Sequence, residues 1–264
     1  MEKTRIESVF FHHTMLPYFR SMEAFSLSIN VPTSWQELSD KQLLFVYTLL
    51  GQDVPVERVM LYAFLRFAGL YIVRKEADGS VYWLRRGRAV YPVKRDDLLY
   101  GAMQLEFIGQ PSMFPLRVEA FNGHPAVNSD LRAFPFGHYL QVENYFQAFL
   151  QSNQTQCLRE IASLLYPGYK GEVDSTMKFN LVSWLYGVKH LFASEFPDLF
   201  RPSPKGGEDD WPDMKAITEA EIRALNGGDI TKTDAVLAAD TWGALAELNA
   251  KAREAQELER IRRK

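Results

Sequence analysis

Apolar residues in the first part of the chain recur at helical spacing. The run LLFVYTLL at residues 43–50 is apolar on nearly every side, which predicts a helix that is buried on all faces. Ser39 and Gln42 fit a capping box at its start, and Gly51 is placed to end it. A second helix is predicted between Pro55 and Gly69, because proline suits a first helical turn. Its apolar stripe consists of Met60, Leu61, Phe64 and Leu65.

The pattern changes to that of β-strands between residues 70 and 93. Two β-type runs, at 70–74 and 80–86, flank Ala77, Asp78 and Gly79, and Asp-Gly is a strong signal for a hairpin turn. Gly87 is followed by a third short run at 89–93. These runs predict a small antiparallel β element between helices. A partly alternating run at 24–31 predicts one further strand.

Helical spacing returns in the middle of the chain. One helix is predicted over 96–108, and then four prolines break the periodicity of residues 109–135. Three apolar stripes follow, and they predict three helices that pack together. The stripes consist of Val142, Tyr145, Phe146, Phe149 and Leu150, of Leu158, Ile161, Ala162 and Leu165, and of Leu181, Trp184, Leu185, Val188, Leu191 and Phe192.

The C-terminal segment differs in composition. Residues 201–214 hold three prolines, two glycines and four acids, which is typical of a linker. Thr218 and Glu221 fit a second capping box, and Asn226-Gly227-Gly228 is placed to end that short helix. A last helix is predicted from Thr233 to the end, with an apolar edge formed by Trp242, Leu245 and Leu248.

Together these patterns predict a mainly α fold of the α+β class. We expect a multi-helix core over residues 1–200 with a small antiparallel β-hairpin element near 70–93. A linker at 201–216 and a C-terminal helical arm at 217–264 follow. The 264 residues are 47% hydrophobic, enough for a sizeable core.

Composition excludes several classes of protein. The net charge is -3, so no global charge favours nucleic acid or an anionic membrane. Cys157 is the single cysteine, which rules out a disulfide within the chain. The first residues, MEKTRIESVFFHHTM, lack the apolar segment of a signal peptide. No apolar stretch approaches the roughly 20 residues that span a bilayer, and the expected compartment is the cytoplasm.

The sequence contains none of the common catalytic motifs. The GxSxG, GxGxxG and P-loop patterns are absent, and Cys157 has no neighbouring base in TQCLREI. None of the five histidines has the spacing of a metal motif such as HExxH; they are His12, His13, His124, His138 and His190. We therefore expect no enzyme activity, no cofactor and no metal site.

The β element carries basic residues interleaved with aromatic ones. Its candidate nucleic-acid-binding residues are Arg74, Trp83, Arg85, Arg86 and Arg88. Charge for phosphates and rings for bases are what single-stranded nucleic acid requires. The favoured interpretation is instead a hairpin whose aromatic residues face the core while its arginines are solvated. Strand alternation would place Tyr82 and Leu84 on one face, and Trp83 and Arg85 on the other.

The end of the last helix has two interpretations of equal weight. Residues 251–264 carry six basic and three acidic residues, a local net charge of +3. They could form a solvated terminal helix whose cations match the helix dipole. Alternatively the helix is an arm that binds a protein partner. The candidate partner-binding residues are Trp242, Leu245, Leu248, Arg253 and Arg260.

Three segments resemble uncharacterised proteins encoded in the tail-gene clusters of Bacteroidetes phages and prophages. They are PTSWQELSDKQLLFVYTLL, YFQAFLQSNQTQCLREIASLLYPG and NGGDITKTDAVLAADTWGALAELNAKAREAQE. The resemblance implies a tail assembly chaperone or a minor structural protein, with a tail or tape-measure protein as its partner. It implies a location in the host cytoplasm or in the virion, and it carries no functional residues across. The leading hypothesis is thus a non-enzymatic phage-type assembly or structural protein, which could form oligomers.

Overall fold

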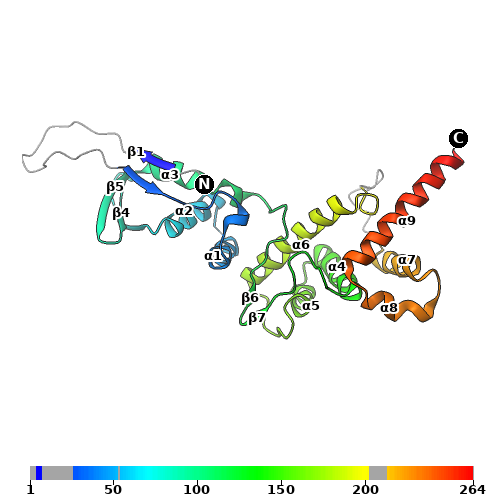
Figure 1. Cartoon of the computed structure of the whole chain (residues 1–264). Coiled ribbons are helices and arrows are strands. Elements are labelled where there is room, and N and C mark those ends of the chain that lie inside the picture. Colours follow the sequence, from blue (N-terminus) through cyan, green and yellow to red (C-terminus); the bar gives the residue numbers. More distant parts are fainter. Residues whose placement is uncertain (1–3, 8–25, 53, 202–212, 264) are drawn as a thin grey trace, which may run out of the picture. The chain divides into compact units, whose positions relative to one another are not determined.

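The computed structural model describes residues 4–7, 26–52, 54–201 and 213–263. Helices dominate it, and the sheet of three antiparallel strands is small, so the predicted mainly α, α+β fold is confirmed (Figure 1). The chain divides into two compact units, Met1–Pro111 and Ser112–Lys264. This boundary differs from the expected division into a core at 1–200 and an arm at 217–264. The β element lies in the first unit and the C-terminal helices belong to the second.

The first unit contains α-helices, short 3-10 helices and strands. Its helices are α1 (Asp40–Leu50), α2 (Val56–Phe67), α3 (Arg95–Met103), η1 (Trp35–Glu37) and η2 (Glu106–Gly109). Its strands are β1 (Thr4–Glu7), β2 (Ser26–Ile29), β3 (Tyr71–Lys75), β4 (Val81–Arg86) and β5 (Ala89–Lys94). Strands β1 and β2 pair in antiparallel fashion, which confirms a strand within 24–31.

Helix α1 begins and ends where the sequence predicts. The Gln42 side chain accepts hydrogen bonds from the backbone N–H and the hydroxyl of Ser39 at 2.9 and 2.8 Å, and Gly51 is the C-cap. The prediction of burial on all faces is wrong, because Leu44 is 37% exposed and Thr48 is also exposed. The opposite side of α1 packs against α2 and the core, so α1 lies at the edge of its unit.

The predicted hairpin and third strand are confirmed. The sheet has the order β3-β4-β5, with Gly79 (φ +71°) and Gly87 (φ +60°) in its two turns. Leu84 is 1% exposed and joins the core of the first unit. Helix α3 is shorter than the predicted 96–108, and η2 follows it. Gly101 lets α3 approach α2 closely, because a Cβ atom there would lie 2.6 Å from Phe64 Cζ.

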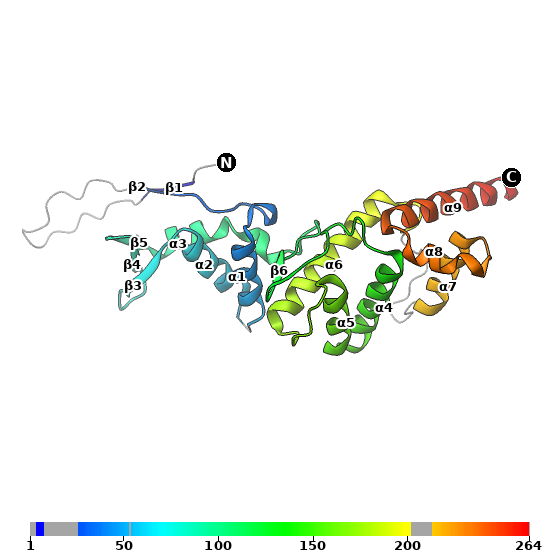
Figure 2. The same cartoon turned by 60° about the horizontal axis from the view of Figure 1, so that its bottom comes forward.

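The second unit is helical, with one minimal hairpin. Its helices are α4 (Phe136–Ser152), α5 (Thr155–Leu165), α6 (Ser175–Glu195), α7 (Met214–Asn226), η3 (Ile230–Lys232), α8 (Thr233–Ala238) and α9 (Thr241–Arg262). The three central apolar stripes all lie on helices, and α4, α5 and α6 pack together as predicted (Figure 2). The rings of Tyr139 on α4 and Phe192 on α6 pack edge to face, with their centres 5.7 Å apart.

The proline-rich stretch before α4 is held by side chains from the C-cap of α5 and from α6. It holds the short strands β6 (Ala120–Phe121) and β7 (His124–Pro125), which the sequence did not predict. The buried Asn180 accepts from the N–H of Val118 at 2.9 Å and donates to the Tyr166 hydroxyl at 2.8 Å. Tyr166 in turn donates to the Val118 carbonyl at 2.8 Å. This closed network satisfies polar groups that burial would otherwise penalise.

The C-terminal helices differ from prediction in two places, while most of the predicted linker (202–212) lies outside the described residues. Asp213 caps the start of α7, so the predicted capping box at Thr218 and Glu221 is wrong. Gly227 ends α7 at φ +65°, as predicted. The single last helix is interrupted at Asp240, whose carboxylate accepts from the N–H groups of Ala133 (2.7 Å) and Gly243 (3.1 Å). These bonds begin α9 and tie its start to the segment before α4.

Candidate functional site

The apolar residues expected to meet a partner are covered by their own chain. Leu245 and Leu248 are 0% and 5% exposed. The Trp242 indole N–H donates to the Asp130 carbonyl at 2.7 Å, and the Arg132 guanidinium lies 4.2 Å from the indole ring. Trp242 also contacts Phe192 at 5.7 Å, edge to face. These three residues hold α9 in the second unit and offer no free docking surface in this conformation.

Two polar side chains of α9, Asn249 and Gln256, hold the end of this anchored part to residues 198–199. Asn249 Oδ1 accepts from the backbone N–H groups of Asp198 and Leu199 at 2.9 and 3.0 Å. One further contact, from Gln256 Nε2 to the Asp198 carbonyl, is longer at 3.4 Å. Beyond it, α9 projects from the second unit, as its red end shows in both ribbon views (Figures 1 and 2).

The projecting part of α9 exposes apolar side chains that the sequence reasoning missed. Leu258 and Ile261 are 58% and 69% exposed, and they lie on one side of the helix with Ala255. Two of the expected residues, Arg253 and Arg260, are exposed on the same half of α9. We call Ala255, Leu258 and Ile261 the apolar strip. Its signal in the sequence is an apolar pair three residues apart within a charged segment.

The register of the sheet places the candidate nucleic-acid-binding residues on different faces. Trp83 pairs with Arg74, and Arg85 pairs with Tyr71 and Val90. Directly paired residues project on the same side of a sheet, so these five side chains share one face. Leu84 and Tyr82 lie on the other face, as the alternation predicts, and only that face packs on the core.

Three of the five predicted residues are thus brought together. Arg74, Trp83 and Arg85 lie on the face opposite Leu84, which we call the outer sheet face. Arg86 projects with Leu84, and Arg88 lies in the turn between β4 and β5. The outer sheet face also contains Lys94 of the same basic cluster, together with Tyr71 and Val90, which no sequence pattern singles out.

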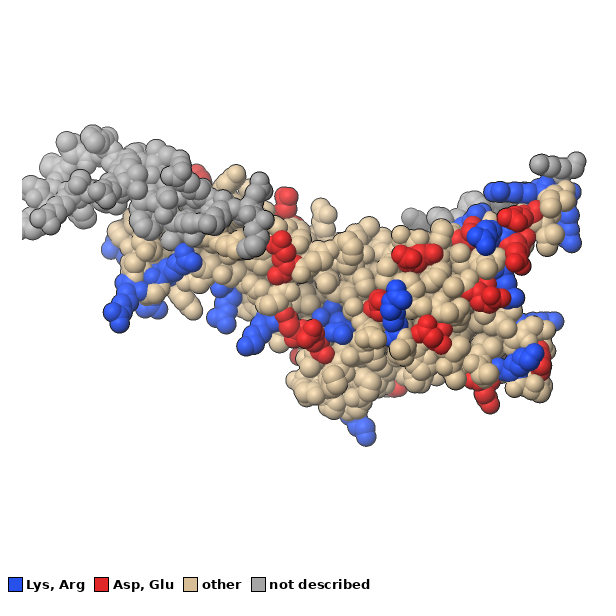
Figure 3. Space-filling model, viewed as in Figure 1, with Lys and Arg blue, Asp and Glu red and all other residues tan. Residues whose placement is uncertain are grey.

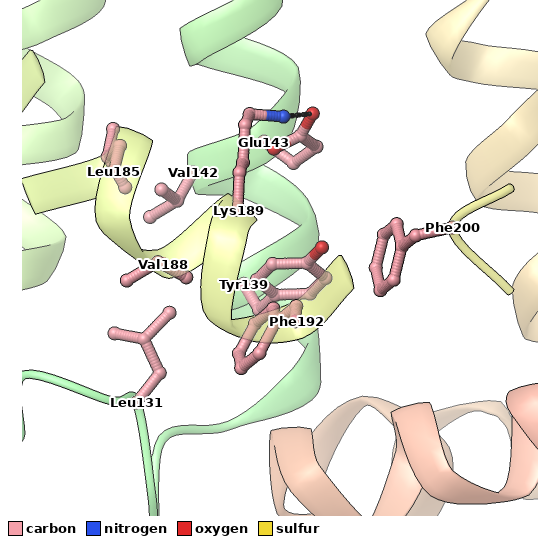
Figure 4. A pocket seen from close by; sticks show the side chains of 9 residues that line it. All are labelled: Leu131, Tyr139, Val142, Glu143, Leu185, Val188, Lys189, Phe192 and Phe200. Carbon is pink, nitrogen blue, oxygen red and sulfur yellow. Dashed lines mark hydrogen bonds and ion pairs between the residues drawn. The ribbon is translucent and has the colours of Figure 1, made fainter. Parts of the chain in front are cut away.

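A small cavity lies between α4 and α6 in the second unit. Its volume is about 50 Å³, and it is lined by Leu131, Tyr139, Val142, Glu143, Leu185, Val188, Lys189, Phe192 and Phe200 (Figure 4). Lys189 forms an ion pair with Glu143 at its rim, and Gln147 donates to the same carboxylate oxygen at 2.8 Å. Binding pockets for metabolites measure roughly 300–1,000 Å³, so this cavity is too small to hold one.

A perturbed carboxyl group lies beside this ion pair. Burial raises the pKa of Glu221 on α7 from 4.5 to about 7, and the negative charge of Glu143 adds to the rise. Glu221 and Glu143 line a neighbouring hollow of about 250 Å³ together with Tyr139, whose pKa is raised by burial. Thr218 also lines this hollow, and its hydroxyl accepts from the Asn144 side-chain amide at 3.4 Å, so these groups form a polar packing contact between α4 and α7.

The remaining candidate residues are scattered. The ring of His124 contacts Tyr169, that of His138 contacts Phe134, and that of His190 contacts Tyr186. Cys157 is partly buried on α5. His12 and His13 lie outside the described residues. Over the described ranges, no three His, Cys, Asp or Glu side chains gather in a way that could hold a metal ion.

Hydropathy of the helices gives one further observation. Among the residues whose placement is described, none of the helices combines the length and the apolar character that crossing a membrane requires.

Comparison with known proteins adds no relative. The chain matches no protein-family model, no curated protein and no solved structure.

Proposed function

We propose that the protein is a non-enzymatic assembly or structural protein that binds another protein through the projecting end of α9. The observation that carries the proposal is the exposure of Leu258 (58%) and Ile261 (69%) on the part of α9 that projects from the second unit. An amphipathic helix that presents apolar residues three apart is a common way to bind a groove or a second helix.

Two further features support this proposal. Helices with little to bury are marginal in water, so a projecting segment gains stability when a partner covers it. Ion pairs one turn apart, Lys251 with Glu247 and Arg263 with Glu259, favour the helical form before the partner arrives. The strip is bordered by charged residues such as Arg253 and Arg260, which would surround an apolar contact with a polar rim.

The phage-type role belongs to this proposal as its most specific form. Because three segments resemble proteins of phage tail clusters, a tail or tape-measure protein is the partner to test first. The binding mode through α9 does not depend on that identity. It requires only a protein surface with an apolar groove.

Site-specific photo-crosslinking tests the proposal in the cells that make the protein. A photoreactive phenylalanine analogue would replace Leu258 or Ile261 in the full chain. The matched control replaces Ile230, an isoleucine that is 83% exposed but lies in η3. We expect the same protein to be crosslinked from positions 258 and 261, and to be absent at 230. Equal crosslinking from all three positions would show nonspecific contact and contradict the proposal.

A further inference from the structure

The first unit carries a second surface of distinct chemistry, the outer sheet face. Tyr71 is 53% exposed and Val90 is 46% exposed, although both lie on paired strands of the sheet. The same face presents the Arg74 side chain at 67% exposure and the exposed Arg85. On the opposite face, Leu84 is buried and the aromatic Tyr82 packs against the core, although Ile72 at the edge of that face is 43% exposed.

The charge of this region is opposite to that of the rest of the chain. Residues 71–95 hold seven Lys or Arg and two Asp or Glu, a net charge of +5, whereas the whole chain carries -3. The remainder of the chain is therefore at -8, and the basic charge is concentrated on the sheet and its turns. Figure 3 shows blue side chains gathered over the part of the sheet that is visible in that view. Such a local concentration attracts a polyanion despite the acidic total.

The aromatic rings lie among the cations. The Arg85 guanidinium lies 5.8 Å from the centre of the Tyr71 ring, within cation–π range. Trp83 occupies the centre of the face, and its indole N–H donates to Glu76 at 2.8 Å, which fixes the ring. Glu76 also pairs with Arg74 at 3.2 Å, so one carboxylate orients both a ring and a cation.

We propose that the outer sheet face binds single-stranded nucleic acid, with Tyr71 and Trp83 stacking on bases and Arg74 and Arg85 contacting phosphates. Unstacked bases are available to protein rings only in a single strand, because in a duplex they are covered by their neighbours. Paired positions across a sheet lie about 5 Å apart, a spacing that lets successive bases reach neighbouring rings and cations.

An acidic polypeptide is the competing occupant, and the exposed Tyr71 ring beside the half-buried Trp83 argues against it. Charge alone would satisfy a polyglutamate segment, and Tyr71 would then contribute little. For a nucleic acid, each stacked base contributes roughly 1–3 kcal/mol, so the ring is needed as much as the charge. Binding that depends on both the Tyr71 ring and the arginine charge therefore distinguishes a nucleic acid from an acidic polypeptide.

Fluorescence anisotropy on the full chain tests this proposal with a labelled 15-nucleotide oligo-dT and the matching oligo-U. We expect saturable binding at low salt that weakens as salt rises, since each phosphate contact contributes about 0.7 to the logarithmic slope. Arg74→Glu with Arg85→Glu should weaken binding at least tenfold and lower the slope by roughly 1.4. Tyr71→Ala should weaken binding about fivefold or more with an unchanged slope.

Matched variants separate the site from general effects. Arg58→Glu with Arg223→Glu changes the net charge by the same amount at exposed positions on α2 and α7, and should leave affinity within about twofold. Tyr62→Ala, at a tyrosine that is 44% exposed on α2, is the control for the ring. Arg74→Lys with Arg85→Lys keeps the charge and should keep the salt slope. Melting curves establish that each variant is folded.

Each outcome of these binding measurements either overturns or supports the proposal that the outer sheet face binds single-stranded nucleic acid. Absence of binding at low salt overturns the proposal, and so does equal weakening by the control variants. Equal competition by polyglutamate or by a duplex of the same length would show a site that recognises charge alone, which also overturns it. Loss with the Arg74/Arg85 and Tyr71 variants, retained binding in the controls and preference for the single strand support it.

Discussion

The leucines of α9 are buried in the first half of the helix and exposed in the second half. In the first half, Leu245 and Leu248 are almost fully covered by the second unit, and Trp242 is hydrogen-bonded to Asp130. In the second half, Leu258 is 58% exposed. The helix is continuous, so local conformation does not separate them. What separates them is whether a folded surface lies opposite, and the hydrogen bonds of Asn249 and Gln256 to residues 198–199 mark the boundary.

The largest expected effect distinguishes the halves by stability. Leu245→Ala should lower the free energy of unfolding by about 3 kcal/mol, because it removes a buried side chain and leaves a cavity. Leu258→Ala should change it by less than about 0.5 kcal/mol, since the side chain is already in water. Urea unfolding of the full chain measures both. Equal losses in the two variants would contradict the division of α9.

The packing of α7 onto α4 should depend on pH through Glu221. Its pKa is raised from 4.5 to about 7, so between these values the folded state binds more protons than the unfolded state. The contribution of protonated Glu221 to the free energy of unfolding is therefore fully present below about pH 4.5 and is lost as the pH rises to about 7. Glu221→Gln should remove this dependence and stabilise the protein above pH 7 by roughly 2 kcal/mol.

Unfolding free energies measured at several pH values between 5 and 8 test this expectation. The control is Glu219→Gln, an exposed glutamate on the same helix that pairs with Lys215 at 4.0 Å. It should leave the pH profile unchanged. A wild-type profile that Glu221→Gln does not alter would show that Glu221 is not the titrating group.

A smaller effect is expected at the boundary between the halves. Asn249→Ala removes the acceptor for the N–H groups of Asp198 and Leu199 and should cost about 1 kcal/mol. Leu199 keeps a bond to the Phe196 carbonyl at 3.1 Å, so the loss falls mainly on Asp198. Asn249→Asp retains an acceptor and should cost less. If the two substitutions cost the same, the hydrogen bonds are not what fixes this boundary.

Local patterns in the sequence predicted most elements, because each has a nearby physical signal. The Asp78-Gly79 turn and the alternation around Leu84 gave the hairpin and its two faces. The stripe around Trp184 gave the long helix α6. The break at Asp240 was missed, because its carboxylate is held by Ala133, a residue more than 100 positions earlier.

The candidate sites were harder to predict for the same reason. Trp242, Leu245 and Leu248 form an apolar edge whether their own chain or a partner covers it, and only the fold shows that their own chain does. Tyr71 was not singled out, since its position beside Arg85 depends on strand register. Periodicity identifies apolar faces but does not say what lies against them.

Hydrogen–deuterium exchange along α9 tests the central claim most directly, with and without the protein crosslinked from position 258. In the free protein, we expect slow exchange for the amides at 245–249 and fast exchange for those at 257–262. With the partner bound, exchange at 257–262 should slow while that at 245–249 stays unchanged. Unaltered exchange at 257–262 in the complex would contradict binding through the projecting end of α9.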